Sequence, residues 1–208
     1  MKTKIIYFIL TLTIISSCAT YKAQYRDEDY TLGELPNKPI EKTFYLLGDA
    51  GKSPFNQISD GLKAFNSHIK NKNTEGDYLL YLGDNIYPAG LPKKNHKGRK
   101  YAEHNLDVQI ESANKFKGTT IFIPGNHDWY ADGVDGVKRQ EKYVEKALGK
   151  NTFLPEDGCP IERVEVNDKI RLIIIDTQWY IENWNHHPTI NDDCEIKTRD
   201  RFFEEIEG

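Results

Sequence analysis

Short apolar runs alternate with amphipathic stretches from about residue 43 to the end of the chain. This alternation is typical of α/β proteins, in which helices cover the faces of a sheet. The runs are rich in β-branched, aromatic and aliphatic residues, as buried strands are. They predict strands at residues 43–47, 78–82, 120–123 and 171–175. Residues 161–166 alternate in polarity and are predicted to pair with the last of these strands as a hairpin through Asn167 and Asp168.

Apolar residues at helical spacing predict a helix between the first two strands and one after each of the next two. The first is expected to start at Ser53, as N-cap, and Pro54, as first residue. The apolar positions that define the first three helices are Ile58, Leu62, Phe65 and Ile69, then Leu106, Ile110 and Ala113, then Val137, Val144 and Leu148. A fourth helix is expected at residues 198–206.

The first seventeen residues resemble an export signal. Lys2 and Lys4 precede an apolar stretch, residues 5–15, that is too short to cross a bilayer. The sequence Ile-Ser-Ser-Cys that ends at Cys18 resembles the lipobox of bacterial lipoproteins, whose cysteine is acylated. An ordinary signal peptide with an incidental Cys18 is the alternative. We expect an exported protein, lipid-anchored to a bacterial membrane through Cys18, in the periplasm or at the cell surface.

Residues 18–42 are polar and aperiodic, which favours a tether between the lipid and a folded domain at residues 43–208. The formal net charge of the chain is -4, so it has no general attraction for nucleic acid or for anionic membranes. An anionic substrate would need bound metal to attract it. Cys159 and Cys194 are either a disulfide, which export permits, or two buried thiols.

Three predicted strands run into a glycine turn that is followed by side chains able to bind metal. Asp49 follows Gly48, Asp84 follows Gly83, and Asn126, His127 and Asp128 follow Gly125. A single such turn is commonly an Asx turn or a helix cap. Three of them meet at one edge if the strands are parallel, because ligands of open α/β sheets bind at the carboxyl ends of the strands. Carboxylate, amide and imidazole groups suit iron, manganese or zinc.

These turns resemble the opening motifs of the calcineurin-like metallophosphoesterases, which read Gly-Asp-x-Gly, Gly-Asp-x-x-Tyr and Gly-Asn-His followed by Asp or Glu. Here they are residues 48–51, 83–87 and 125–128, and the resemblance covers residues 44–177. Gly51 together with Tyr87 is similar to the purple acid phosphatase type, because most other members carry a histidine at the position of Gly51. The family implies a layered β-sandwich flanked by helices within the α/β class.

The resemblance implies a role for each residue of the motifs. Asp49 binds a first metal together with the phenolate of Tyr87, Asp84 bridges both metals, and Asn126 binds the second. The metals implied are a ferric ion and a divalent iron, zinc or manganese ion. His127 stabilises or protonates the leaving oxygen, and Asp128 orients His127. The alternatives are that Tyr87 packs beside Pro88 and that Asp128 is an exposed turn carboxylate.

The function implied is hydrolysis of phosphate esters, with monoesters as the expected substrates and a metal-bridging hydroxide as the nucleophile. A phosphodiesterase or nucleotidase of the same superfamily is one alternative, and a non-catalytic surface lipoprotein is another. The histidines that the family carries later in the sequence are absent, so we expect an incomplete domain with little or no activity by itself.

Several other residues have two interpretations. His186-His187-Pro188 has the letters of a later family motif, but no buried strand precedes it, so we predict a solvent loop. The basic residues between 93 and 100 are expected to be solvated. Four aromatic residues either line a substrate cleft or pack at the sheet edge, and these are Trp129, Tyr130, Trp179 and Tyr180.

Overall fold

The computed structural model describes residues 38–207, almost all of which belong to the second of the two units of the chain, Ile40–Gly208. The predicted export signal, Cys18 and most of the predicted tether, up to residue 37, lie outside the described residues. Between residues 38 and 207, none of the helices has the length and apolar character needed to span a membrane.

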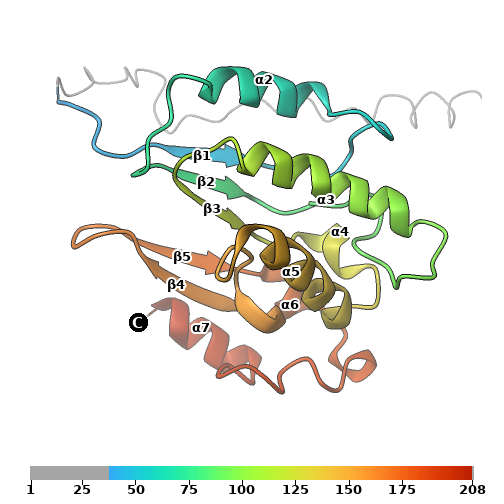
Figure 1. The fold of residues 1–208 in the computed structure, drawn as a ribbon. Coiled ribbons are helices and arrows are strands. Elements are labelled where there is room, and N and C mark those ends of the chain that lie inside the picture. Colours follow the sequence, from blue (N-terminus) through green and yellow to red (C-terminus); the bar gives the residue numbers. More distant parts are fainter. Residues whose placement is uncertain (1–37, 208) are drawn as a thin grey trace, which may run out of the picture. The chain divides into compact units, whose positions relative to one another are not determined.

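The predicted α/β class is confirmed (Figure 1). Three parallel strands form one sheet in the order β1-β2-β3. Their bounds are Phe44–Leu47 for β1, Tyr78–Tyr81 for β2 and Thr119–Phe122 for β3, each within one residue of the prediction. Leu47 pairs with Tyr81, and Tyr81 with Phe122, so the three strands end level with one another.

Three long helices share a hydrophobic core with one face of this sheet. They are α2 (Asp60–Ile69), α3 (Arg99–Ala113) and α5 (Val134–Leu148). Leu79 and Tyr81 of β2 are fully buried in this core together with Leu106 of α3. The apolar residues predicted to define these helices therefore face the core, except Ile58, which precedes α2, and Leu148, which is only partly buried.

The predicted start of the first helix is wrong. Its N-cap is Ser59, whose hydroxyl accepts a hydrogen bond from the backbone N–H of Leu62 at 3.4 Å. Ser53 instead accepts from the N–H of Ser59, and Pro54 begins a turn that precedes the helix. Serine is a favoured N-cap residue at either position, so residue type alone does not decide between the two.

The predicted hairpin of β4 (Ile161–Glu165) and β5 (Arg171–Ile175) is confirmed, and it forms a separate antiparallel sheet. A second core joins this hairpin to the other face of the parallel sheet, where Leu80 of β2 meets Ile174 of β5. The side chains of β2 thus alternate between two cores, because successive residues of a strand face opposite sides. In Figure 1 the hairpin lies below the parallel sheet and α2 above it.

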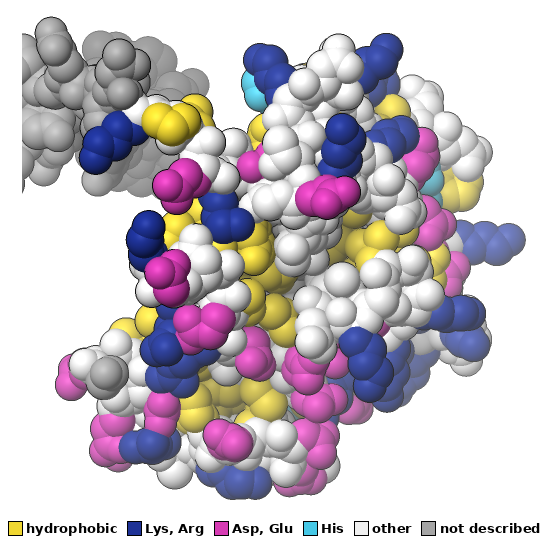
Figure 2. All heavy atoms as spheres, turned by 60° about the vertical axis from the view of Figure 1, so that its left-hand side comes forward, with side chains coloured by type: hydrophobic (Ala, Val, Ile, Leu, Met, Phe, Trp, Pro, Cys, Tyr) yellow, Lys and Arg dark blue, Asp and Glu magenta, His cyan; other side chains and the backbone are white. Residues whose placement is uncertain are grey.

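Some apolar side chains remain at the surface of both sheets. Leu46 of β1 is 57% exposed and Ile173 of β5 is 49% exposed. Figure 2 shows one side of the molecule, where hydrophobic side chains are visible between basic and acidic ones. Charges of both signs are interspersed on the described part of this face.

The remaining elements connect these layers. The predicted final helix is α7 (Arg199–Glu207), and the disulfide between Cys159 and Cys194 is formed, with a Cα–Cα distance of 5.4 Å. Four short elements were not predicted, namely α4 (Asn126–Trp129), α6 (Thr177–Ile181), η1 (Glu156–Gly158) and η2 (Trp184–His186). Of these, α4 follows β3 of the parallel sheet, and α6 follows β5 of the antiparallel sheet.

Candidate active site

The residues that follow the parallel strands meet at one hollow. Because β1, β2 and β3 are parallel, their carboxyl ends lie at the same edge of the sheet. Asp49, Asp84 and Asn126 all line a hollow of about 290 Å³ at this edge, and Asp176, at the end of β5, lines it as well. The predicted convergence of three strand ends is therefore present in the structure.

The two aspartates stand in strained backbone turns. Asp49 has φ 56° and Asp84 has φ 54°, in the left-handed region that few residues other than glycine adopt. Hydrogen bonds hold the two turns together, because the N–H of Asp49 donates to the carbonyl of Gly83 at 3.2 Å and the N–H of Gly51 to that of Asp84 at 3.1 Å. Such conformations persist where surrounding structure enforces them, and they concentrate at functional sites.

Gly51 lies against the turn after β2 so closely that no side chain fits there. A Cβ atom at this position would stand 2.3 Å from the carbonyl carbon of Asn85 and 2.4 Å from the backbone nitrogen of Ile86. The carbonyl of Gly51 also accepts from the N–H of Tyr87 at 2.9 Å. A histidine at position 51 is therefore excluded by this backbone arrangement, and Tyr87 supplies the side chain beside Asp49.

The hydroxyl of Tyr87 lies between the two aspartate carboxylates. It is 2.5 Å from Oδ2 of Asp84 and also within hydrogen-bonding distance of Oδ1 of Asp49. These hydrogen bonds raise the pKa of Tyr87 above its usual value, and the hydrogen bond to Asp49 has the larger effect. Three side-chain oxygens thus lie together at this point, and Tyr87 makes these polar contacts next to Pro88 in the chain.

Asn126 and His127 open α4 beside this cluster. The amide nitrogen of Asn126 donates to the hydroxyl of Tyr130 at 2.5 Å, which leaves the amide oxygen for a ligand. The N–H of His127 donates to Oδ1 of Asp84 at 3.1 Å. Nδ1 of His127 is 2.6 Å from the carbonyl oxygen of Pro88. Because a carbonyl can only accept, Nδ1 carries a proton and Nε2 is the nitrogen left for a substrate.

Asp128 has a different environment from the one predicted. It is fully buried, so the interpretation as an exposed turn carboxylate is wrong. It accepts from the backbone N–H groups of Gly125 at 2.8 Å and of Asn85 and Ile86 at 3.1 Å each. No hydrogen bond of the described residues joins it to the His127 ring. Burial raises the pKa of Asp128 to about 7, and its carboxyl ties the loop after β2 to the loop after β3.

Asp176 is a site residue that sequence reasoning missed. It follows β5, is 1% exposed and caps α6 by accepting from the N–H of Gln178 at 2.9 Å. Its other oxygen accepts from Nε1 of Trp129 at 2.8 Å. Burial raises the pKa of Asp176 to about 7. Its signal in the sequence is an aspartate directly after a predicted strand, but no glycine precedes it as in the other three turns.

Other predicted candidates lie apart from the hollow. His186 is exposed, Nε2 of His187 lies 3.4 Å from a carboxylate oxygen of Glu182, and neither residue lines the hollow. Trp129 and Trp179 are 2% and 0% exposed, and both therefore pack in the core rather than line a cleft. Tyr130, in contrast, is 55% exposed. In the basic loop, Lys93, Lys94 and Lys97 are solvated as expected, whereas Arg99 is buried and pairs with Glu103 at 2.8 Å.

Comparisons with models of known protein families, with curated proteins and with solved structures found no match. Residues 38–207 contain no group of three or more His, Cys, Asp and Glu side chains placed to hold a metal ion. The donors that converge here are instead the carboxylates of Asp49 and Asp84 and the amide of Asn126, which line the hollow, and the phenol of Tyr87, which contacts both carboxylates. All four are hard oxygen donors, a set that suits manganese and other hard cations.

Proposed function

We propose that this protein is a metal-dependent phosphoesterase that hydrolyses phosphate monoesters, of the calcineurin-like type and its purple acid phosphatase subgroup. The position of the Tyr87 hydroxyl between the carboxylates of Asp49 and Asp84 carries the proposal. Two carboxylates held this close repel each other unless a positive charge or a proton lies between them. A metal cation can take the place of the Tyr87 proton and bind all three oxygens.

The wider fold supports the same proposal. A three-stranded sheet faces a two-stranded one, and helices cover the far face of the first. This arrangement agrees with a layered β-sandwich flanked by helices. The absence of room for a side chain at Gly51, with Tyr87 alongside, supports the purple subgroup, in which the tyrosine takes the place of a histidine.

We assign the metal ligands from the donors that line the hollow and from Tyr87, whose hydroxyl contacts two of them. Asp49 and Tyr87 would hold a first cation and Asn126 a second, and Asp84 would be shared between them. Two bound cations would supply Lewis acid stabilisation of the phosphoryl oxygens and activation of water. The strained turns at Asp49 and Asp84 and the buried carboxyl of Asp128 hold the donors in place before the ligands arrive.

His127 acts on the leaving oxygen. The contact of its Nδ1 with the carbonyl of Pro88 fixes the ring and leaves Nε2 for the substrate. A protonated Nε2 can donate a hydrogen bond or a proton to the oxygen of the departing alcohol. Its ring stands between those of Tyr87 and Tyr130, at centroid distances of 4.3 and 4.9 Å, which limits its rotation.

Export and lipid anchoring through Cys18 belong to the same proposal. The disulfide between Cys159 and Cys194 supports export, because such bonds persist in oxidising compartments. Labelling of cells with a radioactive fatty acid tests the anchor. The label is expected on the wild-type protein and absent from Cys18→Ser, and equal labelling of the two would exclude acylation at this residue.

The metal site is tested by Asp84→Asn, with Asp60→Asn on the exposed start of α2 as the matched control. Both are made in the protein expressed from its complete gene, reconstituted with iron and zinc. Elemental analysis is expected to give close to two metals for the wild type and the control and fewer than one for Asp84→Asn. Hydrolysis of an aryl phosphate is expected to fall at least about 100-fold in Asp84→Asn, because the shared ligand is lost.

Two results would contradict the proposal. One is near-wild-type hydrolysis by Asp84→Asn, which would show that Asp84 is not a ligand of the catalytic metals. The other is a wild-type protein that holds less than one metal and leaves aryl phosphates intact, which would favour a non-catalytic lipoprotein.

A further inference from the structure

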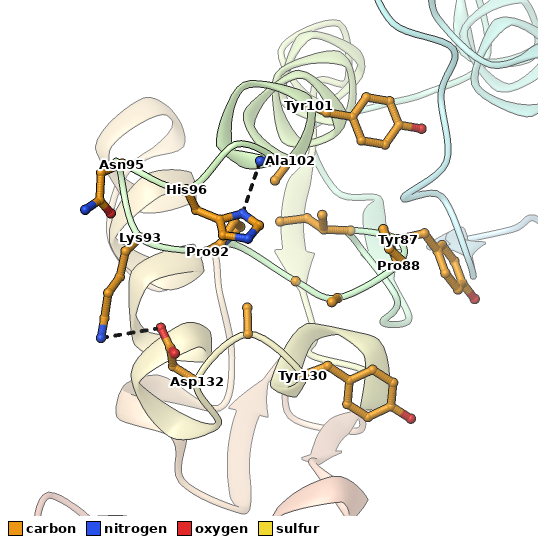
Figure 3. Close-up of a pocket in the computed structure, with 15 residues that line it drawn as sticks. Tyr87, Pro88, Pro92, Lys93, Asn95, His96, Tyr101, Ala102, Tyr130 and Asp132 are labelled. Carbon is orange, nitrogen blue, oxygen red and sulfur yellow. Dashed lines mark hydrogen bonds and ion pairs between the residues drawn. The ribbon is translucent and has the colours of Figure 1, made fainter.

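A second and larger hollow opens beside the candidate active site (Figure 3). Its volume is about 590 Å³, within the range of small-molecule sites. The loop after β2, the start of α3 and the segment after α4 supply its lining. Most of this lining is apolar, and the apolar residues are Ile86, Pro88, Ala89, Pro92, Ala102 and Ala131.

Tyr87 and Tyr130 form a wall that the pocket shares with the active site. Both line the pocket, yet the hydroxyl of Tyr87 contacts Asp84, and that of Tyr130 accepts from Asn126. Figure 3 shows the two rings at one end of the pocket, with their hydroxyl groups directed away from it. The His127 ring lies between them. One of the proposed metal ligands, Tyr87, is therefore also part of the pocket wall.

The opposite end of the pocket is polar but nearly neutral. Lys93 lies 3.9 Å from Asp132, which also pairs with Arg139 at 2.7 Å, so the charges there have partners within the protein. Nδ1 of His96 accepts from the N–H of Gly98 at 3.1 Å, and in Figure 3 the ring reaches into the pocket. Among the described residues, this end of the pocket therefore has no unpaired charge to bind a charged ligand, and the His96 ring can contact an aromatic one.

We propose that this pocket binds the alcohol part of the substrate and that this alcohol is a large aromatic group. The inference rests on the proposed function, because it takes the phosphoryl group to lie at Asp49, Asp84 and Asn126. The ester oxygen then lies near His127, and the group attached to it extends past the shared tyrosine wall. A flat aromatic group buries its faces against apolar side chains and against the rings of Tyr130 and His96, whereas a small alcohol leaves the pocket filled with water.

Filling the pocket tests this assignment. Ala89→Phe and Ala131→Phe each place a ring in it from a different loop, and Ala147→Phe on the exposed side of α5 is the matched control outside it. The quantity compared is kcat/KM for 1-naphthyl phosphate divided by kcat/KM for glycerol 2-phosphate, with the protein expressed from its complete gene. Each substrate keeps its own leaving-group chemistry in every variant, so a change in this ratio reports on the pocket.

We expect the ratio to fall at least about tenfold in both pocket variants, mainly through a higher KM for the naphthyl ester. The ratio is expected to stay at the wild-type value in Ala147→Phe. Thermal unfolding of every variant checks that it is folded. If one pocket variant is unstable, the other still tests the assignment. An unchanged ratio in both folded pocket variants, with turnover intact, would overturn the pocket assignment and leave the proposed function standing.

Calorimetric binding of 1-naphthol separates failure of the pocket from failure of the chemistry. If the wild type binds naphthol and both pocket variants do not, the aromatic preference of the pocket is supported. If the wild type also fails to hydrolyse phosphate esters, only the proposed function is overturned. Absence of both naphthol binding and hydrolysis would overturn both proposals.

Discussion

At the residue scale, Gly51 is a position where the site has no room for a side chain. A Cβ atom there meets backbone atoms of Asn85 and Ile86 at 2.3–2.4 Å, and backbone atoms cannot rotate away as the end of a side chain can. We expect Gly51→Ala to lower the free energy of unfolding by about 2–4 kcal/mol. It should also weaken metal binding, because the turn that carries Asp49 must move away from the turn that carries Asp84.

Gly48→Ala is the matched control, three residues earlier in the same turn. A Cβ atom at Gly48 meets no atom within 4 Å, and its φ is not positive. This variant should change stability by less than about 0.5 kcal/mol. Urea unfolding and elemental analysis measure both effects. Equal stability of the two variants would show that the loop at residues 49–51 adapts without strain.

The sequence was sufficient to predict which residues gather at the strand ends. Glycine turns after parallel strands must lie at one edge, so the proximity of Asp49, Asp84 and Asn126 follows from the order of strands and turns. The environment of Asp128 could not be predicted in this way. Its burial depends on two loops closing over it, and loop packing leaves no periodic signal in the chain.

At the element scale, Glu141 makes the contact between α5 and η1 sensitive to pH. It is 8% exposed and accepts from the N–H of Asp157 at 2.9 Å. Burial raises the pKa of Glu141 to about 7. In the unfolded chain a glutamate has a pKa of about 4.3. Between these values the folded protein binds more protons than the unfolded chain, so the stability that Glu141 contributes falls as pH rises from about 4 to 7.

Glu141→Gln removes this titration and keeps an oxygen for the N–H of Asp157. Relative to the wild type, the variant should gain stability as pH rises, with little difference at pH 4.5 and a gain of roughly 1–2 kcal/mol at pH 8. Urea unfolding at pH 4.5, 6 and 8 measures the difference. Glu111→Gln on exposed α3 surface is the control and should stay within about 0.5 kcal/mol of the wild type. A difference for Glu141→Gln that does not depend on pH would contradict this account.

Long elements were predictable and short ones were not. The periodic apolar faces of α3 and α5 located both helices, because fifteen residues contain several turns of the pattern. The four residues of α4 and the five of α6 contain barely one turn, so no period can be recognised. The strand pattern predicted the hairpin of β4 and β5 but did not indicate that it forms its own sheet, since pairing partners depend on tertiary packing.

At the scale of the whole molecule, the parallel sheet has a core on each face. This explains why the apolar residues of its central strand, β2, form a continuous run. Leu79 and Tyr81 face the helices while Leu80 faces the hairpin, and all three are buried. A strand buried on both faces reads as an unbroken apolar run, which is how β2 was predicted. The hairpin adds the second core, and the disulfide joins the segment before it to the segment before α7.

The double variant Cys159→Ala/Cys194→Ala tests how the two cores depend on each other. The disulfide closes a loop of 35 residues that includes the hairpin and α6, so its removal should lower the free energy of unfolding by about 3–4 kcal/mol. Thermal unfolding of the variant, and of reduced wild type, measures this loss. Metal binding under native conditions should persist, because Asp49, Asp84, Tyr87 and Asn126 all follow strands of the parallel sheet. Loss of metal binding from a folded double variant would show instead that the hairpin, through Asp176 and its contact with Trp129, holds the site together.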